Sequence, residues 1–167
     1  LFDDNGFIPN GTTALVLGAG GASKAICSKL CSNDVKEIFI FDIFKDKADE
    51  LKTHLDSFNF TSKVKIIEND DIDPTCKDSN LIVNCTPIGM KDSDPELINS
   101  DSISSDQCVY DLIYSPPLTK LLDTAKNKGA KYVNGMNMLA YQGAESFAIW
   151  ENVNPPYEIM SKELSGG

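Results

Sequence analysis

The chain has 167 residues, of which 41% are hydrophobic, and this is enough for one domain with a substantial core. Its formal net charge is −10, from 25 acidic and 15 basic residues, which argues against non-specific binding to nucleic acid or to anionic membranes. All 15 basic residues are lysines. A bound phosphate must therefore be held by backbone N–H groups, a helix dipole or lysine rather than by arginine.

Five cysteines, an odd number without a C-x-x-C pair, argue against a disulfide framework or a zinc site. No apolar run approaches the roughly 20 residues of a membrane span, and no signal-peptide pattern is present. We therefore expect a cytoplasmic protein in a reducing compartment, with no bound metal and with neither membrane nor nucleic acid as a partner. The chain opens on Leu1 rather than Met, which suggests a piece of a longer protein.

Apolar runs alternate with amphipathic patterns along the chain, as is typical of βαβ units. Strands are expected at 13–17, 37–41, 63–67, 81–85, 108–112 and within 130–135. Helices are expected at 23–32, 45–58, 119–129 and 138–152. Residues 69–80 are polar and turn-rich, and the tail, 153–167, is expected to fray or dock loosely. The pattern predicts an α/β, Rossmann-like, doubly wound and mostly parallel six-stranded sheet with helices on both faces, with ligands at the carboxyl ends of the strands.

A glycine-rich turn, "GAGGAS" at 18–23, follows the first strand and opens the first helix. Gly18 permits a tight turn, and Gly20 lets the backbone approach a pyrophosphate. Ser23 stands where the usual fingerprint has its third glycine, but it is small enough for close packing of helix on sheet. The alternative is an ordinary tight turn. Its position between a strand and a helix favours nucleotide binding at the helix N-terminus.

An acidic residue, Asp42, follows the second strand about 20 residues after the glycines, as the dinucleotide fingerprint requires. Its carboxylate would accept hydrogen bonds from the adenosine ribose and repel a 2′-phosphate. Ile43 and Phe44 follow where an arginine would answer that phosphate, and Lys45 or Lys47 is the remaining cation. The sequence therefore favours NAD, with NADP less favoured. The alternative role of Asp42 is a helix N-cap.

Four motifs resemble one family, the shikimate/quinate 5-dehydrogenases, over their C-terminal NAD(P)-binding domain. They are "VLGAGGASKAI", "VNCTPIGM", "VYDLIYSPPLTKLL" and "NGMNMLAYQGAESFAIW", and the resemblance runs from about Gly6 to Trp150. It implies one dinucleotide-binding domain at 13–152, preceded by a linker at 1–12 and followed by a C-terminal tail at 153–167. The periodicity alone stops at an NAD-binding Rossmann-like domain.

The resemblance also implies roles for individual residues. The expected cofactor-binding residues are Gly18, Ala19, Gly20, Gly21, Ala22, Asp42, Thr86, Pro87, Leu112, Gly135 and Met138. Tyr114 and Gln142 are the expected substrate-binding residues, although Tyr114 could instead be a core tyrosine and Gln142 a solvated helix residue. Asn137 departs from the glycine that commonly precedes the methionine.

Catalytic residues are not expected in this chain. The family's Lys and Asp pair belongs to a separate N-terminal substrate domain, which the resemblance places before Leu1. The whole enzyme would transfer a hydride between NAD(P) and a ring hydroxyl of shikimate or quinate, and the isolated chain would turn over little or nothing. Three alternatives stay open: a non-catalytic NAD-binding or sensing module, an aminoshikimate-type dehydrogenase, and a methyltransferase-like fold, against which the Tyr114 and Gln142 motifs speak.

Overall fold

A computed structural model describes residues 6–165 of the chain, so the first five residues of the expected linker lie outside the described part. Within it, six strands form one all-parallel sheet in the order β3-β2-β1-β4-β5-β6. The strands are β1 (Thr13–Leu17), β2 (Glu37–Phe41), β3 (Lys63–Ile66), β4 (Leu81–Asn84), β5 (Cys108–Asp111) and β6 (Lys131–Val133). The direction of winding reverses between β1 and β4, which is the topological switch point of this sheet.

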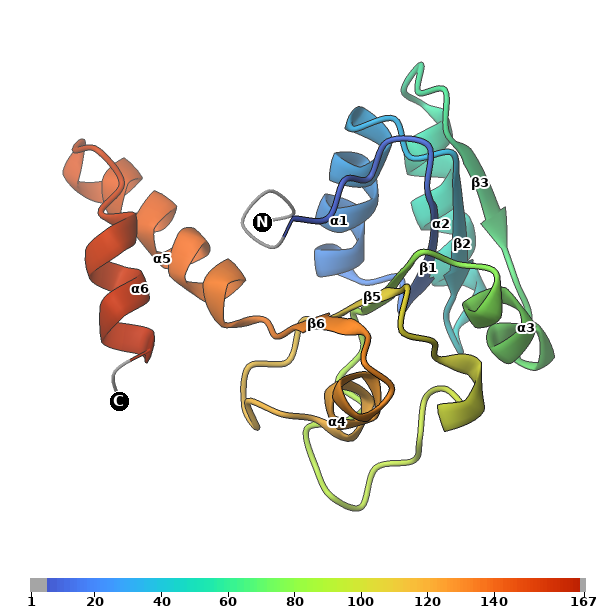
Figure 1. Cartoon of the computed structure of the whole chain (residues 1–167). Helices are drawn as coiled ribbons and strands as arrows, with labels where there is room; N and C mark the ends of the chain where they lie inside the picture. The colour runs from blue at the N-terminus through green and yellow to red at the C-terminus, as the bar shows by residue number, and fades with distance from the viewer. Residues whose placement is uncertain (1–5, 166–167) are drawn as a thin grey trace.

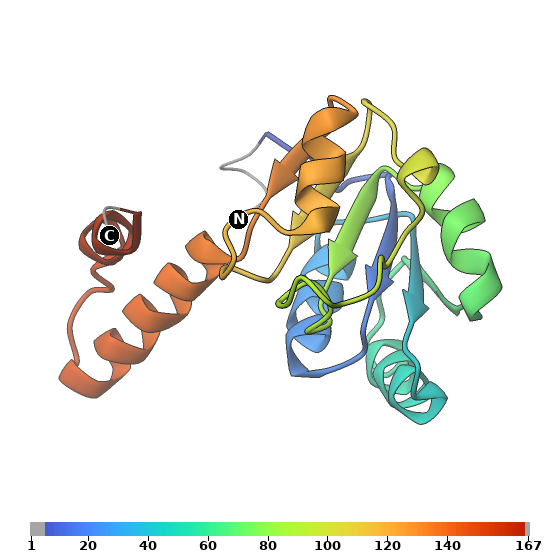
Figure 2. The same ribbon diagram turned by 90° about the horizontal axis from the view of Figure 1, so that it is seen from below.

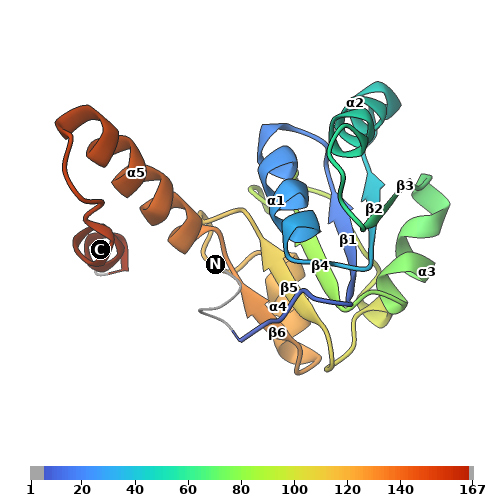
Figure 3. The ribbon, with the colours of Figure 1, turned by 90° about the horizontal axis from the view of Figure 1, so that it is seen from above.

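Helices cover both faces of the sheet, as Figure 3 shows. The helices are α1 (Gly21–Ser32), α2 (Lys45–Asp56), α3 (Ile72–Lys77), α4 (Lys120–Asn127), α5 (Met136–Glu151) and α6 (Tyr157–Ser165). Helices α1 and α2 lie on one face, and α3 and α4 lie on the other. The predicted doubly wound α/β fold is therefore confirmed.

Each face of the sheet has its own apolar core, because successive side chains of a strand point to opposite faces. In β1, Ala14 and Val16 pack with buried residues of α1 and α2. Leu15 and Leu17, on the same strand, pack with buried residues of α3 and α4. Both sets are fully buried, as expected for a parallel sheet covered on both sides.

The segment 69–80, expected to be polar and turn-rich, contains the six-residue helix α3. Ile72 and Cys76, four residues apart, are the buried residues of this helix. A helix of this length holds fewer than two turns, too little for an apolar period to stand out from the polar residues around it. The other predicted helices and strands are present, with ends that differ by up to two residues.

The tail, expected to fray or dock loosely, contains α6, which lies against α5. The rings of Tyr141 and Tyr157 are 4.8 Å apart between centroids. A Cβ added to Gly143 would come within 3.3 Å of the Met160 Sδ, so the two helices approach closely there. Figures 1 and 2 show this helix pair extending away from the sheet.

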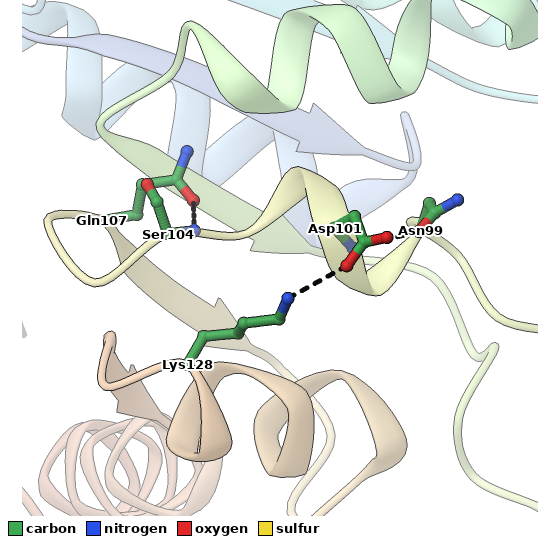
Figure 4. A network of polar contacts seen from close by, with 5 residues as sticks. All are labelled: Asn99, Asp101, Ser104, Gln107 and Lys128. Atoms are coloured by element: carbon green, nitrogen blue, oxygen red, sulfur yellow. Dashed lines mark hydrogen bonds and ion pairs between the residues drawn. The ribbon is translucent and has the colours of Figure 1, made fainter.

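Polar contacts hold the long connection between β4 and β5 (Figure 4). The Lys128 Nζ lies 3.1 Å from Asp101 Oδ1, and the Asp101 N–H donates to Asn99 Oδ1 at 3.0 Å. Gln107, only 2% exposed, accepts from the Ser104 N–H and donates to the carbonyl of Cys76. These contacts tie the connection to α3 and α4.

Among residues 6–165, no helix is long and apolar enough to cross a bilayer.

Candidate dinucleotide site

The turn after β1 requires glycine at its first position. Gly18 has a φ of +94°, and a Cβ there would lie 3.0 Å from the Thr86 Cγ2 and 3.1 Å from the carbonyl oxygen of Cys85. The left-handed backbone and the close approach of the segment after β4 both exclude a side chain. Gly18 thereby brings the turns after β1 and β4 into contact at the switch point.

The N-terminus of α1 faces open space. Its N-cap is Gly20, no side chain caps the first N–H groups, and the first turn holds no acidic residue. A Cβ added to Gly20 or Gly21 would meet nothing within 4 Å. A 12-residue helix with exposed, uncapped N–H groups and room above them is suited to binding an anion.

Asp42, after β2, joins two segments rather than capping a helix. Its Oδ2 accepts from the Ala19 N–H at 2.7 Å, and its Oδ1 accepts from the Phe44 N–H at 2.8 Å. The N-cap of α2 is Phe44, so the alternative role of Asp42 as that cap is wrong. The carboxylate instead fixes the glycine turn against the start of α2.

The two lysines near Asp42 have different surroundings. Lys45 Nζ forms an exposed ion pair with Glu68 at 2.9 Å, which raises the pKa of Lys45. Lys47 Nζ lies 4.8 Å from the centre of the Phe44 ring, a cation–π contact. Lys47 also lines the hollows described next, whereas Lys45 lines neither.

Two hollows meet over the glycine turn. One, of about 340 Å³, lies between the turns that follow β1, β2 and β4, and the other, of about 310 Å³, lies between α1 and α2. They share Ala19, Gly20 and Lys47 and together form one groove across the N-terminus of α1. Of the residues expected to bind cofactor, the first hollow collects Gly18, Ala19, Gly20, Asp42, Thr86 and Pro87. The other walls of this hollow, among them the exposed side chains of Ile43 and Phe44, were not expected from the sequence to bind cofactor.

Cys85 forms part of the same hollow as a neutral group. Burial raises the pKa of its thiol to about 12, and the nearby Ser23 side chain acts in the opposite direction. The thiol therefore stays protonated at neutral pH and does not add negative charge near the helix N-terminus.

Leu112 and Gly135, expected near the nicotinamide, touch through the backbone. A Cβ on Gly135 would lie 1.9 Å from the Leu112 carbonyl oxygen, and the Gly135 N–H donates to the Ile113 carbonyl at 3.1 Å. The segment after β5 and the start of α5 are therefore in direct contact, and only glycine fits.

Of the remaining expected residues, Gly21 lines the second hollow, whereas Ala22, Tyr114, Met138 and Gln142 line neither hollow at the glycine turn. Tyr114 is 46% exposed, so its alternative as a core tyrosine is wrong. Met138 is half-buried near the start of α5, and Gln142, one turn further, is exposed. A separate hollow of about 440 Å³ between α5 and α6 is lined by Asn137, Tyr141 and Lys162, among others, but not by Met138 or Gln142.

Comparison with known proteins supports the resemblance drawn from the motifs. Residues 135–164 match the family described as the shikimate 5′-dehydrogenase C-terminal domain. The chain is 36% identical over 98% of its length to the shikimate dehydrogenase (NADP(+)) of Methanopyrus kandleri, of which it covers 58%. Shikimate 5-dehydrogenase from Listeria monocytogenes, solved with shikimate and NAD, superposes with a TM-score of 0.84 at 29% identity, covering 98% of this chain and 59% of that one.

A shikimate dehydrogenase solved in complex with NADP+ is 31% identical, with a TM-score of 0.77 over 98% of this chain and 56% of that one. The resemblance to the NAD(P)-binding domain of the shikimate/quinate dehydrogenases is therefore confirmed. The chain spans a little over half the length of the curated relatives it matches.

The expectation that NAD is preferred over NADP is wrong when measured against these relatives. The curated relatives, which are 31–39% identical to this chain, carry NADP(+) in their names. The expectation rested on Asp42 and on the absence of arginine. Both oxygens of Asp42 are engaged by backbone N–H groups, and a lysine lines the groove beside it. The acid after β2 is therefore a poor guide to the cofactor here.

Proposed function

We propose that this chain, which is related to the shikimate dehydrogenases over their C-terminal half, is the NADP-binding domain of such an enzyme. The observation that carries the proposal is the groove over the N-terminus of α1, with its open space above Gly20 and Gly21 and its two flanking hollows. The helix N–H groups would hold the pyrophosphate. Ala19 and Ala22 would contact it from the turn.

Lys47 is the residue that we assign to the 2′-phosphate of NADP. It projects from the first turn of α2 into the groove that Ile43 and Phe44 also line. Its ammonium group would supply the charge that arginine provides in other NADP enzymes. Asp42 would act through the backbone, by holding the glycine turn in place.

The nicotinamide end of the cofactor would lie toward the segments after β4 and β5. Thr86 and Pro87 would line its ribose, and Leu112, Gly135 and Met138 would border the ring. Tyr114 and Gln142 would face the substrate. When bound, NADP would supply the hydride acceptor, and this chain would place it through the N–H groups of α1 and the Lys47 ammonium group.

We infer that the substrate is shikimate or a closely related cyclic polyol such as quinate. The reaction class is hydride transfer between a ring hydroxyl and NADP. The groups that move the hydroxyl proton would belong to the part of the relatives that this chain does not match. We therefore expect NADP binding without appreciable shikimate oxidation by this chain, measured as NADPH absorbance, and shikimate-dependent turnover would contradict that division of labour.

The test of the binding proposal is a titration of the isotope-labelled chain with NADP+ followed by amide chemical shifts. We expect saturable shifts at residues 18–23 and 42–47 and at Cys85, Thr86 and Ile88, since Pro87 has no backbone N–H. Shifts confined to α5 and α6 would contradict the assigned site, and the absence of saturable shifts would contradict the proposed function.

A further inference from the structure

Two polar side chains face each other where β4 and β5 end. Asn84 and Asp111 are paired in register, are both 0% exposed, and are the last residues of their strands. The Asn84 Nδ2 donates to Asp111 Oδ1 at 3.0 Å. Burial of a polar group lowers stability unless the group is hydrogen-bonded. The surrounding structure therefore has to supply hydrogen-bond partners for both side chains.

The Asn84 side chain organises the segment after β4. Its Oδ1 accepts from the Thr86 N–H at 2.9 Å and from the Thr86 hydroxyl at 2.7 Å. Its Nδ2 also donates to the Ile88 carbonyl at 3.1 Å. The turn that carries Thr86 and Pro87 therefore wraps around one amide group.

The Asp111 side chain organises the segment after β5 in the same way. Its Oδ1 also accepts from the Ile113 N–H at 3.1 Å, and its Oδ2 accepts from the Thr119 hydroxyl at 2.6 Å. Thr119 in turn is the N-cap of α4 and accepts from the Leu122 N–H. The loop that contains Tyr114 thus begins and ends on one carboxylate.

These contacts leave both side chains well satisfied. Asn84 uses both amide hydrogens and its oxygen, and both oxygens of Asp111 accept hydrogen bonds. A buried polar network in which each group is paired is rigid and has one arrangement. A displacement of either loop would break contacts at the shared Asn84–Asp111 bond.

We propose that the Asn84–Asp111 pair is a positioning bridge that fixes the Thr86–Pro87 turn relative to the Tyr114 loop, and thereby the nicotinamide half of the cofactor relative to the substrate side. This inference rests on the proposed function. Neither residue is a catalytic residue, because both are buried and act through the two loops.

The first test compares two ligands that share one end. NADP+ reaches from the 2′-phosphate to the nicotinamide, whereas 2′,5′-ADP stops at the adenosine end. In Asp111→Asn, an amide replaces one acceptor oxygen, so either the Asn84 Nδ2 or the Thr119 hydroxyl loses the acceptor for its hydrogen. We expect the Kd of NADP+ to rise about tenfold, the size of one hydrogen bond, and the Kd of 2′,5′-ADP to stay unchanged.

The matched control is Asp123→Asn, which makes the same chemical change on the exposed face of α4. Asp123 accepts one hydrogen bond, from Asn127 within the same helix. We expect this variant to leave both Kd values unchanged. A merely structural role for Asp111 would weaken both ligands together, or neither.

The second test needs no ligand and uses a swapped pair. Asn84→Asp places two carboxylates where the 3.0 Å contact now lies. The double variant, Asn84→Asp with Asp111→Asn, restores one donor and one acceptor at that contact, although position 84 then has no hydrogen to donate to the Ile88 carbonyl. We expect amide hydrogen exchange at Thr86 and Ile88 to accelerate in both Asn84→Asp and Asp111→Asn. The effect of Asp111→Asn would pass through Asn84, because none of the bonds above joins Thr86 or Ile88 to Asp111. We expect the exchange rate in the double variant to lie between that of the wild type and that of either single variant, because the contact across the pair returns but the bond to the Ile88 carbonyl does not.

The two proposals fail in different ways. If the wild-type chain binds neither NADP+ nor 2′,5′-ADP, the proposed function is wrong and the positioning role falls with it. If the wild-type chain binds both but Asp111→Asn weakens both equally or neither, the positioning inference alone is wrong. Acceleration of exchange limited to the Ile113 amide, with none across the pair, would also overturn the bridge.

Discussion

The Asp42 carboxylate accepts a hydrogen bond from the Ala19 N–H at 2.7 Å and so fastens the segment after β2 to the glycine turn after β1. Its other oxygen holds the Phe44 N–H at 2.8 Å. An acid at this position is commonly taken as the residue that reads the cofactor ribose. Here its contacts within the protein give it a structural task, which is to shape the floor of the groove.

Removal of the Asp42 carboxylate should therefore destabilise the fold. We expect Asp42→Ala to lower the free energy of unfolding by about 1–2 kcal/mol, because two backbone N–H groups lose a charged acceptor. Urea denaturation measures this loss. The control is Asp49→Ala, on the exposed side of α2, for which we expect less than about 0.5 kcal/mol. Equal losses in the two variants would contradict the structural task of Asp42.

A side chain at Gly135 should not be tolerated. A Cβ there would lie 1.9 Å from the Leu112 carbonyl oxygen, so backbone has to move on one side of the contact. We expect Gly135→Ala to cost about 2–3 kcal/mol in urea denaturation. A variant as stable as the wild type would show that the two segments do not approach as described.

Gly20, unlike Gly135, has room for a side chain, so its substitution should affect cofactor binding more than stability. A Cβ there meets nothing within 4 Å, and Gly20 has the extended backbone of an N-cap, with a φ of −81°. We expect Gly20→Ala to lower the free energy of unfolding by about 1 kcal/mol or less, because alanine is a poorer N-cap than glycine. The added methyl group would occupy space proposed for the pyrophosphate, so the Kd of NADP+, measured by calorimetry, should rise at least about tenfold. Unchanged affinity would argue against the anion at α1.

The pH dependence of stability should report on Asp111. Burial raises the pKa of this carboxyl above its ordinary value of 3.8, although hydrogen bonds from Thr119, Ile113 and Asn84 lower it. In the window above 3.8, the folded state thus binds more protons than the unfolded state. The stability contributed by this group is full below pH 3.8 and is lost as the pH rises through the folded pKa.

Asp111→Asn removes that titration. We expect the free energy of unfolding of the wild type, minus that of the variant, to decrease as the pH rises from below 3.8 and then to level off. Urea denaturation at a series of pH values measures the difference. An increase over the same window would mean that the hydrogen bonds outweigh burial.

Much of the fold could be predicted because its signals are local. The apolar runs that became β1 and β2 have the predicted bounds, and the glycine turn between β1 and α1 follows from its spacing. Helix α3 was missed because it is shorter than two full turns. Helix α6 spans only nine residues, in which Tyr157 and Met160 lie against α5 and Ile159 is 67% exposed, so its apolar pattern is weak.

The site was only partly predictable. The turns after β1, β2 and β4 meet because parallel strands end at one edge, and this follows from the sequence pattern. That Asp42 bonds to Ala19 and that Asn84 bonds to Asp111 are contacts between distant segments, which no single-sequence period encodes. A polar residue ends each of the two apolar runs, in "LIVN" and "CVYD", and this signal could have indicated the second pair but was not used to predict it.

This chain is proposed to bind NADP through Lys47 and the N-terminus of α1. The most direct measurement is calorimetric titration of the wild type and Lys47→Gln with NADP+ and NAD+, with Lys52→Gln, which removes an exposed pair with Asp56, as the control. We expect the wild type and the control to bind NADP+ more tightly than NAD+. In Lys47→Gln the Kd of NADP+ should rise about tenfold, as for one charged hydrogen bond, with NAD+ unaffected. Tighter binding of NAD+ by the wild type, or an NADP+ affinity that does not depend on Lys47, would contradict the account.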